Sequence, residues 1–181
     1  MLLDTPVCDF GARAPAFVLR DPGAAEAGVP MSAGDKGLLV AFICNHCPYV
    51  LGIAERLASD LNSLLDEGFG VLAVMSNDYA AYPADAPDRM AAFAKAHGFR
   101  FPYLVDEDQA VARAYGAVCT PDFFGYNAAL ELQYRGRLDD AGRGAAATRV
   151  PELLNAMRQI GATGQGPRDQ VASMGCSIKW R

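Results

Sequence analysis

Apolar residues along the chain follow two different spacings, which predict an alternation of strands and helices. Residues 37–43 and 69–75 are continuous apolar runs of strand length, which is typical of strands buried on both faces. Between Pro48 and about Asp66, apolar residues recur at steps of three and four, which predicts an amphipathic helix that ends before Gly68. A strand, a helix and a second strand in this order are expected to form a right-handed βαβ unit.

Three more helices and three more strands are indicated outside this unit. Asp85 and Asp88 have the spacing of a helix cap, as have Asp106 and Gln109. The short segment 127–129 separates two apolar runs and is typical of a tight hairpin turn. Together these elements predict a mixed α/β fold with a central sheet flanked by helices. The expected helices cover residues 85–97, 106–115 and 148–160, and the expected strands cover residues 17–19, 123–126 and 130–134.

Length and composition fit one domain with a short tail. The chain has 181 residues, of which 51% are hydrophobic, and this is enough for a substantial core. Residues 20–37 are rich in Gly, Pro, Ala and Asp and are expected to form turns, whereas residues 161–170 have the composition of a linker. We therefore expect a domain over residues 1–160, including an N-terminal extension, and a C-terminal tail over residues 161–181 that packs on it.

The charge of the chain argues against several classes of partner. The sequence has 16 Lys and Arg against 21 Asp and Glu, a formal net charge of −5 at pH 7. An acidic chain with no basic run repels nucleic acid and anionic lipid, so we expect neither as a partner. The first residues lack the pattern of a signal peptide, and no apolar stretch reaches the roughly 18 residues of a membrane helix. The expected compartment is the cytoplasm.

The cysteines fit redox chemistry better than a disulfide framework. There are five, at positions 8, 44, 47, 119 and 176. An odd number at irregular spacing is a poor basis for structural disulfides. In a reducing compartment, cysteines are more often free, catalytic or metal-binding.

The segment Cys44-Asn45-His46-Cys47-Pro48 stands between the first predicted strand and the first long helix. Pro48 suits the first helical position, which puts Cys47 at the N-cap, where free N–H groups and the helix dipole favour a thiolate. Thiols in such places have pKa values of roughly 3.5–7.5 instead of about 8.5. We predict that Cys47 is an ionised, solvent-accessible nucleophile and that Cys44 resolves its intermediates as an internal disulfide. His46 is expected to lend positive charge or to accept a proton.

Two other interpretations of the cysteine pair stay open. The pair is also half of a structural zinc site, although zinc usually takes four ligands and the chain has only two histidines, His46 and His97. Buried free cysteines can also be inert, because a thiol packs like a small hydrophobic group.

Thr120-Pro121, directly before a predicted strand, is a second signal, because Pro is confined to strand starts and turns. With the cysteine motif, it makes the chain resemble the thioredoxin superfamily and, more narrowly, the peroxiredoxin-like (AhpC/TSA, redoxin-domain) family. The resemblance implies a thioredoxin-like fold in which Pro121 is cis and faces the active cysteine. It also implies that Thr120 offers backbone groups to a substrate and that Cys119 lies close by. The matching segments are residues 42–50, 76–78, 101–104, 115–124, 134–140 and 175–180.

The chain departs from both parent patterns at three positions. Thioredoxins have a second cysteine downstream of the nucleophile, where this chain has Val50. Peroxiredoxins have a Thr three residues before their reactive cysteine, where this chain has Cys44. Thioredoxins also carry a buried acid just before the strand Phe, where this chain has Ala41. The proton-relay role of that acid therefore has no occupant at this position.

Four further residues have two interpretations each. Cys176, in the tail, is either a resolving thiol that folds back onto the site or a packed cysteine. Cys119 is either a third redox partner or a small core residue. Arg135 and Arg137 alternate along a predicted strand and so share a face. They would steady a thiolate or an anionic substrate, although a solvated surface cluster is the preferred interpretation.

Three functions follow as hypotheses. In a thiol–disulfide oxidoreductase, Cys47 attacks a substrate disulfide and Cys44 releases the product. In a thiol peroxidase, a hydroperoxide oxidises Cys47 to a sulfenic acid, which condenses with Cys44, Cys119 or Cys176. In a non-enzymatic protein, Cys44, Cys47 and His46 hold or deliver a soft metal. We expect no bound cofactor, a thiol or disulfide protein or a hydroperoxide as substrate, a separate electron donor, and, by analogy with peroxiredoxins, a homodimer.

Overall fold

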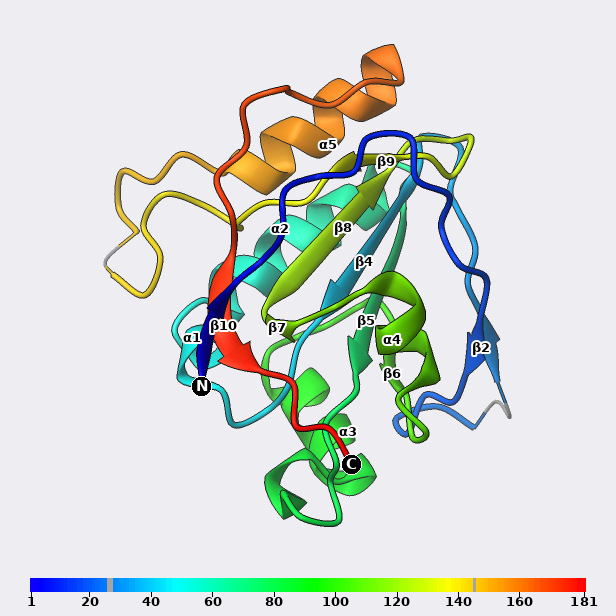
Figure 1. The fold of residues 1–181 in the computed structure, drawn as a ribbon, viewed down its shortest axis with the longest axis vertical. Helices are drawn as coiled ribbons and strands as arrows, with labels where there is room; N and C mark the ends of the chain where they lie inside the picture. Colours follow the sequence, from blue (N-terminus) through cyan, green and yellow to red (C-terminus); the bar gives the residue numbers. More distant parts are fainter. Residues whose placement is uncertain (26–27, 145) are drawn as a thin grey trace.

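The centre of the protein is a five-stranded mixed sheet, seen in a computed structural model that describes residues 1–25, 28–144 and 146–181 (Figure 1). Three neighbouring strands run parallel to one another, and each of the next two strands runs antiparallel to the strand before it. The order across the sheet is β6 (Tyr103–Val105), β5 (Gly70–Met75), β4 (Leu38–Phe42), β8 (Asp122–Tyr126) and β9 (Leu132–Tyr134). The fold predicted from the sequence is confirmed.

The central strand β4 is buried on both faces, as its continuous apolar sequence predicts. Leu39 and Ala41 join one hydrophobic cluster, whereas Leu38, Val40 and Phe42 join a second one. All five side chains are completely buried. Because side chains alternate along a strand, one apolar run fills the cores on both sides of the sheet.

Helices cover both faces of this sheet. The first cluster packs under α1 (Pro48–Leu51), α2 (Ala54–Asp66), α3 (Pro87–Ala96) and α5 (Glu152–Thr163). The second cluster packs under α4 (Ala110–Tyr115) and the N-terminal segment. Within the described part of the chain, none of these helices has the length and apolarity to cross a bilayer.

The predicted helix from Pro48 to Asp66 is wrong in one respect, because it is interrupted. The one-turn α1 ends at Gly52, and α2 begins at Ala54 after Ile53. Glycine is a poor helix former, and its N–H still bonds to the Pro48 carbonyl oxygen at 3.0 Å. Cys47 therefore stands before a single helical turn, not before a long helix.

Other helix starts are also shifted from their predicted places. A 3₁₀ turn, η1 (Pro83–Asp85), precedes α3, which starts at Pro87 with Ala86 as its N-cap, so Asp85 does not cap it. Pro87 lacks an N–H and suits the first helical turn. The predicted helix from Asp106 starts only at Ala110, and its N-cap is Gln109, although the Asp106 carboxylate accepts the N–H groups of Val111 and Ala112 at 3.2 and 2.8 Å.

A second, three-stranded sheet was not predicted. It joins β1 (Leu2–Asp4), β10 (Met174–Ser177) and β7 (Cys119–Thr120), with β10 in the middle (Figure 1). The red C-terminal strand and the blue N-terminal strand run side by side across the end of β4 where the cysteine motif begins. None of these segments carries an apolar run that would predict a strand. The C-terminal tail is thus built into a sheet.

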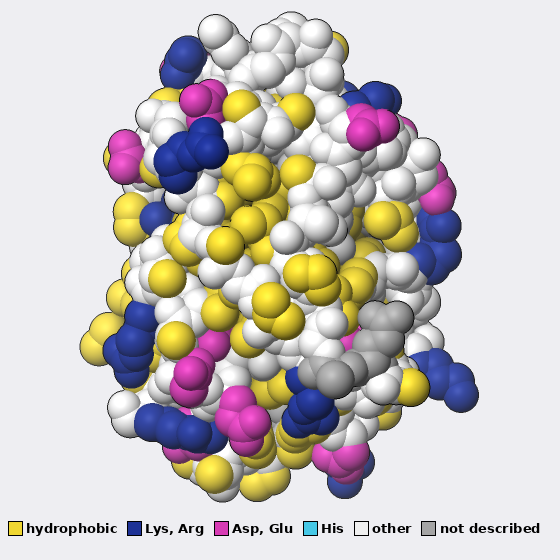
Figure 2. Space-filling model, turned by 90° about the vertical axis from the view of Figure 1, so that its right-hand side faces the viewer, with side chains coloured by type: hydrophobic (Ala, Val, Ile, Leu, Met, Phe, Trp, Pro, Cys, Tyr) yellow, Lys and Arg dark blue, Asp and Glu magenta, His cyan; other side chains and the backbone are white. Residues whose placement is uncertain are grey.

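The N-terminal segment covers the second cluster. A two-stranded ribbon of β2 (Val18–Leu19) and β3 (Val29–Pro30) lies in it, and the predicted strand 17–19 corresponds to β2. Partly buried apolar side chains of the segment, such as Phe17 and Met31, pack on the cluster. Figure 2 turns this side toward the viewer and shows hydrophobic side chains gathered in its middle, with charged ones mostly around them.

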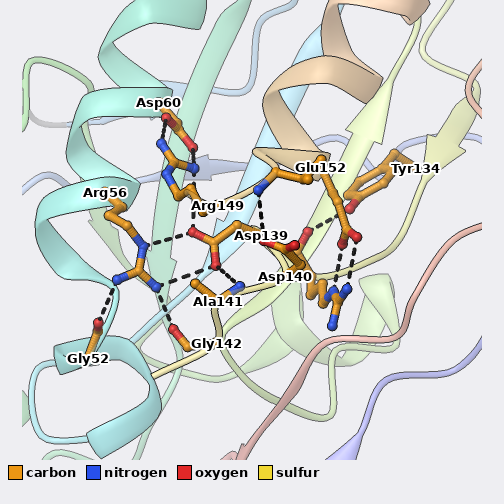
Figure 3. A network of polar contacts seen from close by, with 12 residues as sticks. Gly52, Arg56, Asp60, Tyr134, Asp139, Asp140, Ala141, Gly142, Arg149 and Glu152 are labelled. Carbon is orange, nitrogen blue, oxygen red and sulfur yellow. Dashed lines mark hydrogen bonds and ion pairs between the residues drawn. The ribbon is translucent and has the colours of Figure 1, made fainter. Parts of the chain in front are cut away.

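A buried polar network holds the segment before α5 against α2 (Figure 3). Arg149 forms two hydrogen bonds with Asp60 of α2, at 2.6 and 2.7 Å. The fully buried Asp139 accepts from Arg56 at 2.8 Å and lies 3.4 Å from Arg149. Buried carboxylates need such partners, because a lone charge in the interior is costly.

Leu61→Ala tests the packing of α2. The Leu61 side chain is completely buried, and its loss should lower the free energy of unfolding by about 2–5 kcal/mol. Leu51→Ala, at a side chain that is 49% exposed, is the matched control and should cost less than about 1 kcal/mol. Chemical denaturation measures both, and equal losses would contradict the described core.

Candidate active site

The two motif cysteines lie in the loop between β4 and α1. Cys47 is the N-cap of α1, with extended backbone angles (φ −69°, ψ 122°), and Pro48 takes the first helical position. The structure thus places Cys47 at the helix start that the sequence predicts. Both cysteines are buried: Cys44 is 1% exposed and Cys47 is 0% exposed. The expectation of a solvent-accessible Cys47 is wrong for this conformation.

Thr120 of β7 connects the two thiols. Its hydroxyl oxygen lies 3.3 Å from the sulfur of Cys44, and its carbonyl oxygen lies 3.1 Å from the sulfur of Cys47. The Thr120–Pro121 peptide bond is cis, in agreement with the resemblance noted above. The cis bond thus lies next to a residue that contacts both cysteines.

The surroundings of Cys47 favour its thiolate. A hydrogen bond from the Cys44 thiol, helped by the thiol and backbone N–H of Cys176 and the N–H of Val50, lowers its pKa to about 4. Burial and the Thr120 carbonyl oxygen, which accepts a proton only from a thiol, act in the opposite direction. More groups donate to the Cys47 sulfur than accept from it, so the net effect is a lowered pKa of Cys47.

Cys44 is affected in the opposite sense. Its pKa is raised well above the usual range, first because its thiol donates to Cys47, then because of burial and the nearby carboxylate of Asp85. The pair therefore holds one proton on Cys44 and a negative charge on Cys47. The cause differs from the prediction: α1 has only four residues, so individual N–H and S–H donors replace a long helix dipole.

Asp85 is the residue of this site that sequence reasoning missed. Its carboxylate is completely buried and accepts the backbone N–H of Asn45 and the side-chain amide of Asn77, both at 2.8 Å. The Nδ1 atom of His46 lies 2.8 Å from its Oδ2 atom. Sequence reasoning assigned Asp85 to a helix cap, because an Asp near the start of an apolar pattern usually is one. Nothing in the sequence connects it to a motif 38 residues upstream.

His46 is positioned by two neighbours. Its ring stacks on Tyr82 with 5.7 Å between centroids, and its Nδ1 atom faces Asp85. Ligand atoms of Cys44, His46 and Asp85 all lie within 4.8 Å of one another, so these three side chains could hold a soft metal. Structural zinc takes four protein ligands, whereas this set has three.

The tail reaches the same group of residues through Asn77. The side-chain oxygen of Asn77 accepts the N–H of Lys179 at 2.8 Å, while its amide group donates to Asp85. The carbonyl oxygen of Lys179 also accepts from the N–H of Asp78 and from the side chain of Gln109, each at 2.8 Å. Asn77 thus bridges the tail and the buried acid.

The other cysteines have different surroundings. Cys176 of β10 is half-buried, and its thiol and N–H contact Cys47. Cys119 is buried on β7, its thiol lies 3.7 Å from the Pro121 carbonyl oxygen, and burial raises its pKa to about 12. Cys8 packs on the second cluster, and burial raises its pKa to about 11. Of these three, only Cys176 contacts Cys47.

The expectations for the two arginines are corrected. β9 ends at Tyr134, so Arg135 and Arg137 do not share a strand face. Arg135 is buried, not solvated, and donates to Asp122 at 2.9 and 3.3 Å. Arg137 pairs with Glu152 at 2.6 and 2.8 Å (Figure 3). Each guanidinium has its own carboxylate, and neither is among the groups that act on Cys47.

A cleft of about 460 Å³ opens beside the motif. Tyr49, Ile53 and Pro121 line it on one side, and tail residues 171–174 line it on the other. Its wall combines apolar groups with a few charged ones, as is usual for ligand sites. Both Tyr49, two residues beyond Cys47, and the cis proline Pro121 line it.

Comparisons with known proteins agree with this fold. The model of the AhpC/TSA family matches residues 10–141. An uncharacterized conserved protein from Geobacillus kaustophilus is 35% identical, with a TM-score of 0.92 over 100% of this chain and 97% of that one. A hypothetical protein from Sinorhizobium meliloti is 39% identical, with a TM-score of 0.86 over 98% and 97%. No match was found among curated proteins.

A more distant likeness supports the fold alone. The thioredoxin domain of a thiol-disulfide oxidoreductase from Bacteroides vulgatus is 16% identical, with a TM-score of 0.62. The comparison covers 83% of this chain and 96% of that one. The identity is too low for that protein's activity to be transferred by likeness.

Cys44→Ala tests the hydrogen bond between the two thiols. Between pH 4 and 8 only Cys47 should titrate, because the pKa values of the other cysteines are raised. The ultraviolet absorbance of the thiolate should therefore disappear as the pH falls through about 4. Removal of Cys44 should raise this midpoint by about one pH unit or more. Cys8→Ala is the control, and an unchanged midpoint in Cys44→Ala would contradict the assigned cause.

Proposed function

Because the chain belongs to the AhpC/TSA family, within the thioredoxin superfamily, we propose that it is a thiol–disulfide oxidoreductase with Cys47 as nucleophile and Cys44 as resolving thiol. One observation carries this proposal: two thiols meet at Thr120, one with a lowered and one with a raised pKa. An attacking thiolate and a protonated partner are the two states that disulfide exchange needs.

The exchange follows from these two states. The Cys47 thiolate attacks one sulfur of a substrate disulfide, and the other substrate sulfur leaves as a thiolate. Cys44 then loses its proton and attacks Cys47, which releases the second substrate thiol and leaves a Cys44–Cys47 disulfide. The substrate gains two electrons and the protein loses them. A separate thiol donor restores the pair.

The second step needs an acceptor for the Cys44 proton, and Asp85 with His46 supports this role. The Asp85 carboxylate is close enough to raise the pKa of Cys44, and it is aligned by Asn45 and Asn77. His46 lies between this carboxylate and solvent, since its side chain is 31% exposed. We therefore assign to Asp85 the proton-relay role that Ala41 cannot fill.

The cleft beside Pro121 is the proposed place for the substrate. Its apolar wall next to Tyr49 suits an extended peptide segment around a disulfide. We propose the cytoplasm as its compartment, where the cysteines would be kept reduced between turnovers. A disulfide-containing protein is thus the proposed partner.

Family membership also supports a second candidate, thiol peroxidase chemistry at Cys47. A hydroperoxide is small enough for a covered thiol. However, Arg135 and Arg137, the two arginines considered for steadying a thiolate or an anion, are paired with carboxylates and are not among the main groups that lower the pKa of Cys47. We therefore rank exchange above peroxide reduction.

Metal binding is a third candidate, supported by the approach of Cys44, His46 and Asp85 within 4.8 Å. The carboxylate of Asp85 already accepts from two amide groups, so it is compensated without a cation. This observation favours the redox proposal over a metal-delivery role.

Cys47→Ser should abolish exchange. We expect the wild-type protein to reduce a protein disulfide in the presence of a dithiol, and Cys47→Ser to lose at least about 10³-fold of that rate, because a serine hydroxyl is not ionised near pH 7. Peptide mapping after mild oxidation should find a Cys44–Cys47 disulfide. Cys8→Ser is the control.

Two outcomes would contradict this proposal. Stoichiometric metal in the purified protein, together with no Cys44–Cys47 disulfide, would favour metal binding. Peroxide consumption without exchange would favour a peroxidase.

Asp85→Asn should slow the resolving step only. The amide cannot accept the Cys44 proton, so release of the mixed disulfide should slow about tenfold or more, while the first attack by Cys47 stays unchanged. The release rate should also become more dependent on hydroxide and rise with pH. Asp88→Asn, at a side chain that is 77% exposed, is the control. An equal loss in both steps with an unchanged pH profile would indicate a merely structural Asp85.

A further inference from the structure

The reactive pair is covered in this structure. Cys47 is 0% exposed and Cys44 is 1% exposed. Exchange requires one sulfur to approach another directly, so access limits the rate of any reaction with an external thiol. A disulfide between these two residues would therefore be shielded from external thiols by the tail. The site therefore needs a way to pass electrons between the buried pair and solvent.

The strand that covers Cys47, β10, carries a cysteine of its own. β10 packs against α1, and in the β7–β10 pairing Cys176 stands opposite Thr120, the residue that contacts both motif cysteines. Cys176 packs against the hydrophobic cluster that contains Cys44 and Cys47, and its thiol and N–H help to lower the pKa of Cys47. Cys176 is also half-buried, so its side chain is partly open to solvent. Of Cys44, Cys47 and Cys176, only Cys176 is not fully buried.

The position of Cys176 is held from both sides. On the N-terminal side, Gly175 lies so close to β7 that a Cβ atom there would be 2.0 Å from the Thr120 carbonyl oxygen. On the C-terminal side, Lys179 is bound through Asn77, Asp78 and Gln109. A cysteine held this way is part of the site and not part of a loose tail.

We infer that Cys176 is a third redox thiol, which relays electrons between the buried Cys44–Cys47 disulfide and an external thiol. This inference rests on the proposed exchange function.

The relay has three steps. First, the Cys176 thiolate attacks Cys47; a Cys47–Cys176 disulfide forms, the Cys44–Cys47 bond breaks, and Cys44 leaves and takes up a proton. An external thiol then attacks the exposed Cys176 sulfur, forming a mixed disulfide and releasing the Cys47 thiolate. A second external thiol attacks the external sulfur of that mixed disulfide and frees Cys176. In sum, two external thiols become one disulfide. The protein gains two electrons and one proton, which is on Cys44, and the second proton goes to solvent because Cys47 stays a thiolate.

The lowered pKa of Cys47 favours the second of these attacks, that of the external thiol on Cys176. In a Cys47–Cys176 disulfide, Cys47 is the better leaving group, because its pKa is lowered whereas burial raises that of Cys176. A thiol with a low pKa leaves faster, so the attacked sulfur is that of Cys176. It is also the more exposed of the two. Access and leaving-group ability thus select the same atom.

The first experiment measures reduction of the oxidised protein by glutathione, with acid quenching, alkylation and mass spectrometry. Cys176→Ser should still form the Cys44–Cys47 disulfide but should be reduced about tenfold or more slowly than the wild type. Cys8→Ser, at another half-buried cysteine, should be reduced at the wild-type rate. Reduction of Cys176→Ser at the wild-type rate would overturn the inference and leave the proposed function intact. A wild-type protein that forms no Cys44–Cys47 disulfide would instead overturn the proposed function.

A second experiment leaves β10 unchanged, in case Cys176→Ser disturbs that strand. Cys44→Ala is oxidised with glutathione disulfide and mapped by peptide analysis. We expect a Cys47–Cys176 disulfide, and in the wild type we expect the glutathione mixed disulfide on Cys176. Glutathione attached to Cys47 with Cys176 free, in both proteins, would contradict the relay.

Discussion

Two buried thiols that share one hydrogen bond do not ionise together, and the site is organised around this constraint. Burial disfavours charge on either sulfur, but a proton kept on Cys44 stabilises a thiolate on Cys47. Thr120 sets the arrangement, because its hydroxyl group faces one sulfur and its carbonyl oxygen faces the other. The division between nucleophile and resolving thiol therefore comes from their mutual contact more than from the helix that follows them.

A buried acid completes this arrangement from a distant part of the chain. Asp85, in η1, approaches Cys44 across the loop after β5, and Asn45, His46 and Asn77 surround its carboxylate. Such a charge is tolerated because each oxygen has a partner. The same Asn77 holds the C-terminal tail through Lys179. The acid, the cysteine motif and the tail are thus connected by direct hydrogen bonds.

The tail changes what the motif can do. With β10 in place, the thiolate that the motif creates is shielded from solvent, and the least buried cysteine of the cluster is Cys176. Shielding protects a thiolate from unwanted oxidation and restricts the partners that can reach it. Because β10 pairs with β7 at Thr120, closure of the site and alignment of the thiols depend on the same strand contact.

The sequence by itself determined the parts of this protein that are encoded locally. The apolar runs of β4 and β5, the spacing of α2 and the placement of Cys47 before Pro48 all follow from neighbouring residues, since strand and helix periodicity are local properties. Only the tertiary structure decided the sheet made by both chain ends, the pairing of Arg135 with Asp122, and the approach of Asp85 and Cys176 to the motif. These features join residues that lie from 13 positions apart, as Asp122 and Arg135 do, to 174 positions apart, as Leu2 and Cys176 do. The segments involved are short or polar and carry no periodic signal. Their contacts therefore form only once the core has brought these segments together.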